Sequence, residues 1–366
     1  MLNPSRPATQ FFDASKRRTW NFNETRKKMK LGRIGIPTVD GEQLRIVAVE
    51  PEQGRVIDLA RAYMLTLMRG GASQDRAREI AREFFPSSMS AAIALGDAFL
   101  ETAHESMGAA DDASTQIESV SWRAAVDSPV IRDGLTFETH IHNFFKNVAK
   151  AQPARSIYKR PGYFKASTAM VYGNDQELPY PDFTDQLDWE FEIGLVVGKP
   201  GSDLTPENSL GCLFGVTIFN DFSARDVQAI EMPILMGPQK SKDFAYGIGP
   251  WITTVDELPS IEGLSGKVRL NGEVVSTTKV ENFVYTPAEL LAYVSISDRL
   301  QPGDLIGSGT MGFGSGVEIG RFLQPGDVLE LELEKVGILR TPVSSERHKA
   351  PWWPAERPYP HEDWEL

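Results

Sequence analysis

The sequence predicts an α+β fold that is mainly β, in which a small N-terminal α+β module precedes a larger β-rich domain. Helical periodicity is concentrated before residue 120, at about 73–85 and 90–106. Beyond residue 120 the β-prone runs multiply, and glycines cluster between them. A length of 366 residues with 41% hydrophobic residues is enough for a sizeable core.

The chain divides into four segments. Residues 1–30 form a basic arm with eight Lys or Arg and two acidic residues, and they lack the apolar stretch of a signal peptide. We expect this arm to be exposed, or to pack on a neighbouring subunit. A small domain follows at 31–120, with the polar stretch 108–115 near its end, and the β-rich domain covers 121–345. The Pro- and Trp-rich tail, 346–366, is expected to lie across its own domain or a partner's.

Several local signals justify individual elements. The segment 44–62 reads as two strands around a turn at Gly54, and "NG" at 271–272 is a strong hairpin signal. Thr286, Pro287 and Glu289 form a capping box that predicts one short helix within the β region. The sequence "LQPGD" occurs twice, at 300 and 323, and each copy predicts a turn that leads into a strand.

Charge and composition exclude several classes of partner. A net charge of -12 disfavours nucleic acid and anionic membranes, which are bound through basic surfaces. No apolar run approaches the roughly 20 residues that a membrane span needs. The single Cys212 is expected to be a small core residue, and cytoplasmic residence is the default. Small molecules and metal cations remain as ligands.

The stretch "LDWEFEIG", 187–194, alternates apolar and acidic residues. Side chains two residues apart share one face of a strand and lie roughly 6.6 Å apart along it, so Glu190 and Glu192 reach one point above the sheet. Two carboxylates about 4 Å apart repel by about 4 kcal/mol at an effective dielectric constant near 20. The pattern therefore indicates protonation, a bound cation, or a solvated edge strand. Asp188 shares this face without an assigned role.

A third carboxylate favours the cation. The apolar run that begins at residue 215 ends in Asn220 and Asp221, which places an oxygen ligand at the end of a second strand. All-oxygen ligation suits Mg²⁺, Mn²⁺ or Ca²⁺ better than zinc, for which the sequence offers no Cys cluster and no His pair at helical spacing.

Four motifs together resemble one family. "LDWEFEIGLVVGK", "FNDFSARDVQ", "KSKDFAYGIGPW" and "GDLIGSGT" occur in the order and approximate spacing of the fumarylacetoacetate hydrolase family. The resemblance covers about 125–345, with a weaker match in the N-terminal part. It implies a mixed β-sandwich roll for the catalytic domain, a divalent metal ion and a homodimer.

The resemblance also implies roles for individual residues. It implies metal binding for Glu190, Glu192 and Asp221. It implies that Lys242 lies beside the metal, and that the substrate is contacted by Arg225, Gln228, Tyr163 and Thr310. Arg225 has an alternative as the partner of Asp226 or another nearby acid. Lys240 has the alternative of an ordinary surface charge.

A histidine completes the set. Family hydrolases that cleave carbon–carbon bonds use a histidine followed three residues later by an asparagine, and His140 with Asn143 fits this pattern whereas His142 does not. Glu318 matches the glutamate that orients the histidine. An imidazole with a reference pKa of about 6.5 takes a proton from water, and a carboxylate stabilises the imidazolium that results.

One position departs from the family. Long members carry a fourth metal-binding aspartate just before the histidine, and alignment on Phe137 puts Thr136 there. Either three carboxylates and water suffice, or Asp133 or Glu138 takes part. Glu138 has further readings as a partner of the histidine, a proton shuttle or a surface acid.

These residues predict a metal-dependent hydrolase that cleaves a carbon–carbon bond in a β-diketo acid or acylpyruvate. The expected metal is Mg²⁺, with Mn²⁺ or Ca²⁺ as alternatives. Rival readings are a decarboxylase, isomerase or hydratase/lyase of small keto acids that uses the same site, and a catalytically silent metal-binding member of the family.

Overall fold

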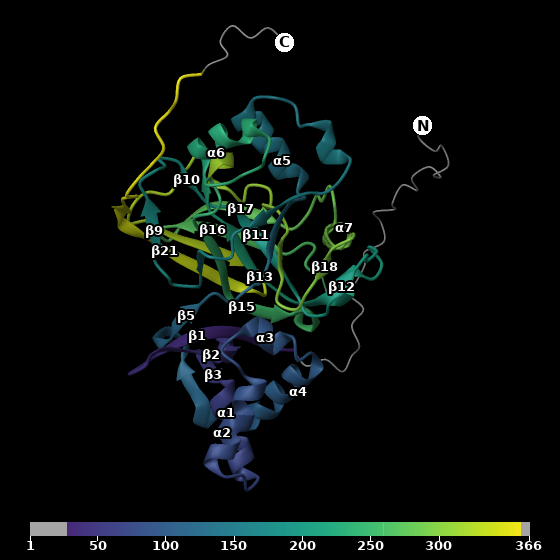
Figure 1. Ribbon diagram of the computed structural model, residues 1–366, viewed down its shortest axis with the longest axis vertical. Helices are drawn as coiled ribbons and strands as arrows, with labels where there is room; N and C mark the ends of the chain where they lie inside the picture. Colours follow the sequence, from purple (N-terminus) through teal and green to yellow (C-terminus); the bar gives the residue numbers. More distant parts are fainter. Residues whose placement is uncertain (1–27, 259, 360–366) are drawn as a thin grey trace.

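The computed structural model describes residues 28–258 and 260–359, and it has two parts (Figure 1). The N-terminal part, at the bottom of the view, carries four helices against strands. The larger part, above it, is rich in strands and carries short helices at its upper end (Figure 1). Residues 1–27 of the predicted arm and 360–366 of the predicted tail lie outside the described residues.

One twelve-stranded sheet runs through both parts. Its main order is β4-β3-β2-β1-β15-β13-β11-β19-β6-β7, with β5 paired to β1 and β8 to β15. The strands are β1 Lys30–Thr38, β2 Gly41–Glu50, β3 Arg55–Asp58, β4 Ser114–Gln116, β5 Ser121–Arg123, β6 Ile131–Leu135, β7 Gly162–Ala166, β8 Val171–Tyr172, β11 Phe191–Val197, β13 Leu213–Asp221, β15 Tyr246–Thr254 and β19 Leu305–Gly307. β5 lies just after the predicted domain boundary at residue 120, and it pairs with β1, which lies before that boundary. The domain division at residue 120 stays a prediction.

A second sheet of five strands, in the order β17-β16-β20-β21-β9, belongs to the larger part alone. Its strands are β9 Leu178–Pro181, β16 Ser265–Leu270, β17 Glu273–Lys279, β20 Val328–Leu333 and β21 Gly337–His348. Two short pairs add β10 Leu187–Asp188 with β14 Ser223–Ala224, and β12 Gly201–Ser202 with β18 Arg299–Leu300. The prediction of an α+β, mainly β fold is confirmed.

The helices fall into two groups. The N-terminal part contains α1 Leu59–Arg69, α2 Gln74–Phe84, α3 Met89–Ile93 and α4 Asp97–Ser106, and the larger part contains α5 Glu138–Phe144, α6 Arg225–Glu231, α7 Pro287–Val294 and α8 Gly316–Ile319. None of the described helices is long and apolar enough to cross a membrane. The single helical stretch predicted at 90–106 is wrong in one respect. It forms two helices, because Gly96 adopts a φ of 66° outside the helical region.

The predicted hairpin, helix cap and "LQPGD" turns are confirmed. β16 and β17 form a hairpin around Asn271, whose φ is 55°. Thr286 caps α7 through the complete capping box with Glu289. Both copies of "LQPGD" form turns that lead into β19 and β20.

The edges of the predicted arm and tail are structured. Lys30 already belongs to β1 and pairs with Glu257, so the arm is shorter than residues 1–30. At the other end β21 continues to His348. Trp353 stacks on Phe183 with ring centroids 4.9 Å apart, so the described part of the tail contacts its own domain at this residue.

The cores explain how the acidic strand is held. Phe191, Ile193 and Leu195 point from one face of β11 into a core shared with the five-stranded sheet. The other face carries Glu192 and Val196, and Val196 joins the core beneath the N-terminal helices. "LDWEFEIG" is not one continuous strand, because β10 ends at Asp188 and β11 begins at Phe191. The alternation of side chains nevertheless persists across this break.

Candidate metal and active site

Three buried carboxylates form the centre of the site. Asp133 on β6, Glu190 just before β11 and Glu192 on β11 each offer an oxygen, and these atoms lie within 4.8 Å of one another. β19 lies between β11 and β6 in the sheet, and its last residue, Gly307, is in register with Asp133. A Cβ atom at Gly307 would lie 2.6 Å from Asp133 Oδ1 and 2.7 Å from Glu192 Oε2. The glycine therefore leaves the space in which the two carboxylates approach each other.

Two of these carboxylates are poorly compensated. Burial raises the pKa of Asp133 well above its usual range, and repulsion by Glu192 adds to the effect. Burial likewise raises the pKa of Glu192, with repulsion by Glu190 and Asp221 contributing. The donors to Glu192 are the backbone N–H of Gly309, at 2.8 Å, and the hydroxyl of Thr310, at 3.3 Å. These two neutral donors do not offset the desolvation of the charge.

Glu190 is compensated by cations. Burial alone would raise the pKa of Glu190, but attraction by Lys242 and Arg225 outweighs it, and the pKa lies below its usual range. Lys242 Nζ donates to Glu190 Oε2, and Arg225 Nη2 donates to Glu190 Oε1 at 2.7 Å. Glu190 is therefore the ionised member of the group.

Asp221 lies beside the group rather than within it. Its Oδ2 accepts a hydrogen bond from Lys242, and Oδ1 has no hydrogen-bond partner among the described residues. Burial raises the pKa of Asp221 well above its usual range against the attraction of Lys242, and repulsion by Asp133 contributes. Of the three metal ligands expected from sequence, Glu190 and Glu192 belong to the compact group, and Asp133 takes the third place there.

Of the alternatives for the fourth carboxylate, Asp133 lies in the group and Glu138 does not. Thr136, which the alignment on Phe137 put in the position of the fourth aspartate, donates its hydroxyl to the carbonyl of Ser308. Glu138 accepts a hydrogen bond from Tyr158 at 2.8 Å on the exposed side of α5. The local signal for Asp133 was weak, because only Val130 and Ile131 are apolar in "VIRD" and Arg132 separates them from the aspartate.

The group fits a divalent cation. Asp133 Oδ1 and Asp221 Oδ1 are buried acceptors without donors among the described residues. Five buried carboxylates lie in and around the group: Asp133, Asp188, Glu190, Glu192 and Asp221. When all five are ionised, they outnumber the two cations, Lys242 and Arg225, by three. Oxygen-only ligands of this kind suit Mg²⁺, Mn²⁺ or Ca²⁺.

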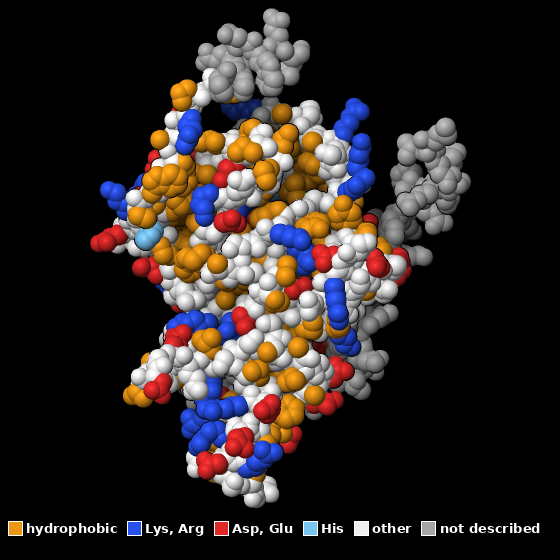
Figure 2. Space-filling model, viewed as in Figure 1, with side chains coloured by type: hydrophobic (Ala, Val, Ile, Leu, Met, Phe, Trp, Pro, Cys, Tyr) orange, Lys and Arg blue, Asp and Glu red, His pale blue; other side chains and the backbone are white. Residues whose placement is uncertain are grey.

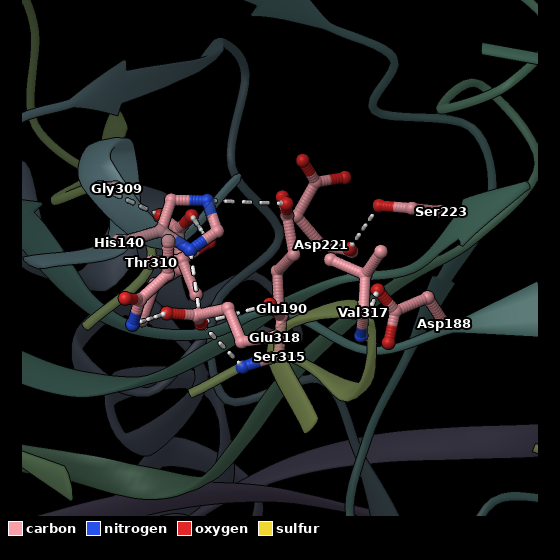
Figure 3. A network of polar contacts seen from close by, with 12 residues as sticks. His140, Asp188, Glu190, Asp221, Ser223, Gly309, Thr310, Ser315, Val317 and Glu318 are labelled. Carbon is pink, nitrogen blue, oxygen red and sulfur yellow. Dashed lines mark hydrogen bonds and ion pairs between the residues drawn. The ribbon is translucent and has the colours of Figure 1, made fainter. Parts of the chain in front are cut away.

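A histidine–glutamate pair faces the carboxylates. His140 Nδ1 lies 3.0 Å from Glu318 Oε2, and its Nε2 lies 3.9 Å from Glu190 Oε1. Figure 3 shows His140 between these two carboxylates. Because 3.9 Å is longer than a hydrogen bond, Nε2 is available to a water molecule or a substrate atom. His142, two residues along α5, is exposed and points away from the group.

Glu318 is fixed by several donors. Asn143 Nδ2 donates to Glu318 Oε1 at 2.9 Å, and the backbone N–H groups of Phe313 and Ser315 donate at 2.9 Å and 3.2 Å. Burial alone would raise the pKa of Glu318, but the hydrogen bond and charge of His140, with help from Asn143, lower it below its usual range. The glutamate is thus held ionised and in one orientation.

Lys242 and Arg225 are permanent cations of the site. Burial alone would lower the pKa of Lys242, but Asp221 and Glu190 raise it above its usual range. Arg225 Nε donates to Asp188 at 2.7 Å, so its partners are Asp188 and Glu190. Of the alternative partners of Arg225, Asp226 is therefore wrong, and pairing with other nearby acids is confirmed. Lys240 is exposed, as its alternative reading as a surface charge requires.

Of the remaining residues expected to contact the substrate, Gln228 lies beside the site and Tyr163 does not. Gln228 is half-buried and accepts a hydrogen bond from Arg225 Nη1 at 3.0 Å, which places it beside the site. Tyr163 does not join the group. It lies opposite Gly134 on β7 and packs edge-on against Tyr293 of α7, whereas Phe164 is the residue opposite Asp133. Adjacent residues of a strand point to opposite faces, so Tyr163 points away from Asp133.

Cys212 takes no part in this site. It is buried in the core of the larger part, and burial raises the pKa of its thiol to about 12. A thiol that stays protonated is a poor nucleophile, which agrees with the expected core role.

Comparison with known proteins identifies the family. A sequence model of the C-terminal region of fumarylacetoacetate (FAA) hydrolases matches residues 129–344. The chain belongs to the fumarylacetoacetate hydrolase family. It is also 30% identical over 246 residues to an uncharacterised protein of Staphylococcus aureus, a match that covers 66% of this chain and 78% of the relative. The resemblance noted in the sequence is confirmed.

Solved structures of family members have the same fold. A fumarylacetoacetate hydrolase from Exiguobacterium antarcticum is 24% identical with a TM-score of 0.64, covering 87% of this chain and 100% of that one. A maleylpyruvate hydrolase from Sphingobium is 19% identical with a TM-score of 0.63, and the match covers 86% of this chain and 99% of that one. A 2-hydroxyhepta-2,4-diene-1,7-dioate isomerase from Mycobacterium marinum is 20% identical with a TM-score of 0.58, and the match covers 86% of this chain and 98% of that one. At these identities the likeness shows the fold.

The raised pKa values predict how metal-free protein responds to pH. A carboxyl group with a raised folded-state pKa contributes stability that is present below its unfolded pKa of about 4 and lost as pH rises through the folded value. Asp133, Glu192 and Asp221 all belong to this class. In EDTA, the melting temperature of Glu192→Gln should therefore fall less between pH 5 and pH 8 than that of the wild type, and Mg²⁺ should raise the wild-type value most at pH 8.

Calorimetry across this pH range measures both effects, with Glu138→Gln as a control for the loss of a half-buried carboxylate outside the group. Equal pH slopes for the wild type and Glu192→Gln would contradict the buried, uncompensated charge.

A second prediction concerns the space at Gly307. A methyl group there would press on Asp133 and Glu192, so Gly307→Ala should lower stability by about 1–3 kcal/mol through overpacking and weaken metal binding at least tenfold. Gly211→Ala is the matched control, because a Cβ there meets nothing within 4 Å. Denaturant unfolding and Mg²⁺ titration give the two values. Unchanged metal affinity in Gly307→Ala would show that the two carboxylates do not act together.

Proposed function

We propose that this chain is a divalent-metal-dependent hydrolase that cleaves a carbon–carbon bond in an acylpyruvate or a related β-diketo acid. The observation that carries the proposal is the buried His140–Glu318 pair, whose free nitrogen faces a group of carboxylates suited to a cation. A bound Mg²⁺, or Mn²⁺ or Ca²⁺ in its place, would polarise substrate oxygens and supply positive charge as a Lewis acid.

The protein's own residues supply a base. His140 Nε2 takes a proton from water, and Glu318, hydrogen-bonded to Nδ1, stabilises the imidazolium that results. Asn143 and the backbone around Ser315 keep Glu318 in place during this transfer. The hydroxide oxygen then bonds to the substrate's acyl carbon, so that the acid product gains the water oxygen.

The electron pair of the broken carbon–carbon bond passes to the pyruvate fragment as an enolate, which takes a proton to complete the second product. Lys242 and Arg225 are buried and protonated, so they are suited to stabilise negative charge rather than to act as bases. Gln228, hydrogen-bonded to Arg225 and half-buried, is the neutral polar group next to them. The hydroxyl of Thr310 donates a hydrogen bond to Glu192, and we propose that Thr310 also contacts the substrate at the edge of the group.

Some of the rival reactions need the cation but not a water-activating base. Decarboxylation or isomerisation of a small keto acid would leave the His140–Glu318 pair without a water molecule to deprotonate, whereas hydration would use the pair as hydrolysis does. The solved structures with this fold include an isomerase as well as hydrolases. The histidine–glutamate pair is therefore the feature that favours hydrolysis. A catalytically silent protein would have no use for it either.

The homodimer implied by the family resemblance stays a proposal. Exposed apolar side chains are available for such a contact, at Ile230 in the last turn of α6 and at Leu235 and Met236 after it. Figure 2 shows further hydrophobic side chains exposed on the larger part.

Replacing the histidine tests the reaction. His140→Ala should lower hydrolysis of an acylpyruvate by about 10²- to 10⁴-fold, the usual contribution of a general base, and leave Mg²⁺ affinity within about twofold. His142→Ala, two residues away on the exposed side of α5, should retain wild-type turnover. A panel of acylpyruvates and 2-oxo acids, assayed with and without EDTA, provides the substrates.

The outcomes separate the candidates. Near-normal acylpyruvate hydrolysis by His140→Ala would refute the role of the base. Metal-dependent decarboxylation or isomerisation that survives in His140→Ala would support the rival reaction. No turnover by the wild type across the panel would support a silent protein.

A further inference from the structure

Asp188 is a buried carboxylate that neither the metal group nor the proposed reaction uses. It lies at the end of β10 with no exposed surface, and both of its oxygens are occupied. Oδ2 accepts from Arg225 Nε at 2.7 Å and from the backbone N–H of Val317 at 3.2 Å. Oδ1 accepts from the backbone N–H of Gly316 at 2.7 Å and of Trp189 at 2.8 Å. Figure 3 shows Asp188 beside Val317.

One pair of these contacts leads to the carboxylate group. The guanidinium of Arg225 is planar, so fixing its Nε fixes the directions of its other two nitrogens. Nη2 donates to Glu190 at 2.7 Å, and Nη1 donates to Gln228 at 3.0 Å. The position of the cation on Glu190 therefore depends on the hydrogen bond that Asp188 accepts.

The other pair leads to the base. Gly316 and Val317 are the first two residues of α8, and Glu318 is the third. Glu318 in turn accepts the hydrogen bond at His140 Nδ1. Asp188 thus holds the backbone immediately before the residue that orients the histidine.

We infer that Asp188 is a positioning residue that aligns both halves of the site, holding Arg225 against Glu190 and the start of α8 beneath Glu318. The role rests on the proposed function, because it serves that reaction. Fold stability alone does not require such a group. A buried ionic chain of Asp188, Arg225 and Glu190 loses the solvation of all its charges, and well-packed apolar residues commonly match it in stability. What apolar residues do not supply is a fixed direction for the guanidinium.

Substitution by asparagine separates this role from packing. Asp188→Asn keeps the size of the side chain and one oxygen acceptor, but an amide nitrogen does not accept a hydrogen bond from Arg225 Nε. With Mn²⁺ alone as the probe and no substrate, isothermal titration should show binding about 10-fold weaker than in the wild type, the usual effect of losing a supporting contact behind a metal ligand.

The control is Asp226→Asn, which removes the carboxylate next to Arg225 in the chain. Asp226 accepts from Thr184 and from the backbone N–H of Asp185, and its loss should leave Mn²⁺ affinity within about twofold.

A double-mutant cycle shows whether Asp188 acts through Arg225. In an Arg225→Gln background, Asp188→Asn should change Mn²⁺ affinity by less than about twofold, because the contact it removes is already absent. If Asp188 had a merely structural role, Asp188→Asn would lower the Mn²⁺ affinity by the same factor, or the melting temperature by the same amount, in both backgrounds. Equal factors in the two backgrounds would therefore overturn the inference.

Arg225→Lys covers the case in which Asp188→Asn does not fold. Lysine keeps the charge, but its single ammonium does not reproduce the fork that joins Asp188 to Glu190. Mn²⁺ affinity should again fall about 10-fold. Wild-type affinity in Asp188→Asn or in Arg225→Lys would contradict the positioning role while the wild type still binds the ion. Failure of the wild type itself to bind Mn²⁺ would instead contradict the proposed function, and the positioning role with it.

Discussion

The site depends on the burial of several carboxylates with too few cations to neutralise them. Lys242 and Arg225 together compensate Glu190, and the cost of the arrangement appears at Asp133, Glu192 and Asp221, whose pKa values burial raises. Three neighbouring buried groups of this kind are unfavourable in a fold without a ligand. A divalent cation would relieve this conflict, because it would satisfy the oxygens that lack donors and reduce the excess of negative charge.

The sheet explains why these groups meet. β11, β19 and β6 are neighbours, so Glu192 and Asp133 lie on strands separated only by the strand that ends in Gly307. Apolar side chains on the other face of β11 fix its height above the five-stranded sheet. Both α5 and α8 then place His140 and Glu318 over the same point. His140 and the acidic group are therefore positioned by different elements that share one core.

Local pattern was sufficient to predict most of the fold and part of the site from the sequence. Alternation placed Glu190 and Glu192 on one face, and the end of an apolar run located Asp221. Asp133 could be named only as one alternative beside Glu138, because its place depends on β6 pairing in parallel with β19, a contact between residues about 170 positions apart that no local pattern encodes. The face on which Tyr163 lies depends in the same way on the register of β7 against β6.

The central claim is that the buried group of Asp133, Glu190 and Glu192 binds a divalent ion, and anomalous diffraction from a crystal soaked in Mn²⁺ tests it most directly. One peak per chain is predicted, with oxygens of these three residues about 2.0–2.6 Å from it. The same map reveals whether Asp221 joins them. Absence of a peak at this group, or a peak confined to other carboxylates, would contradict the claim.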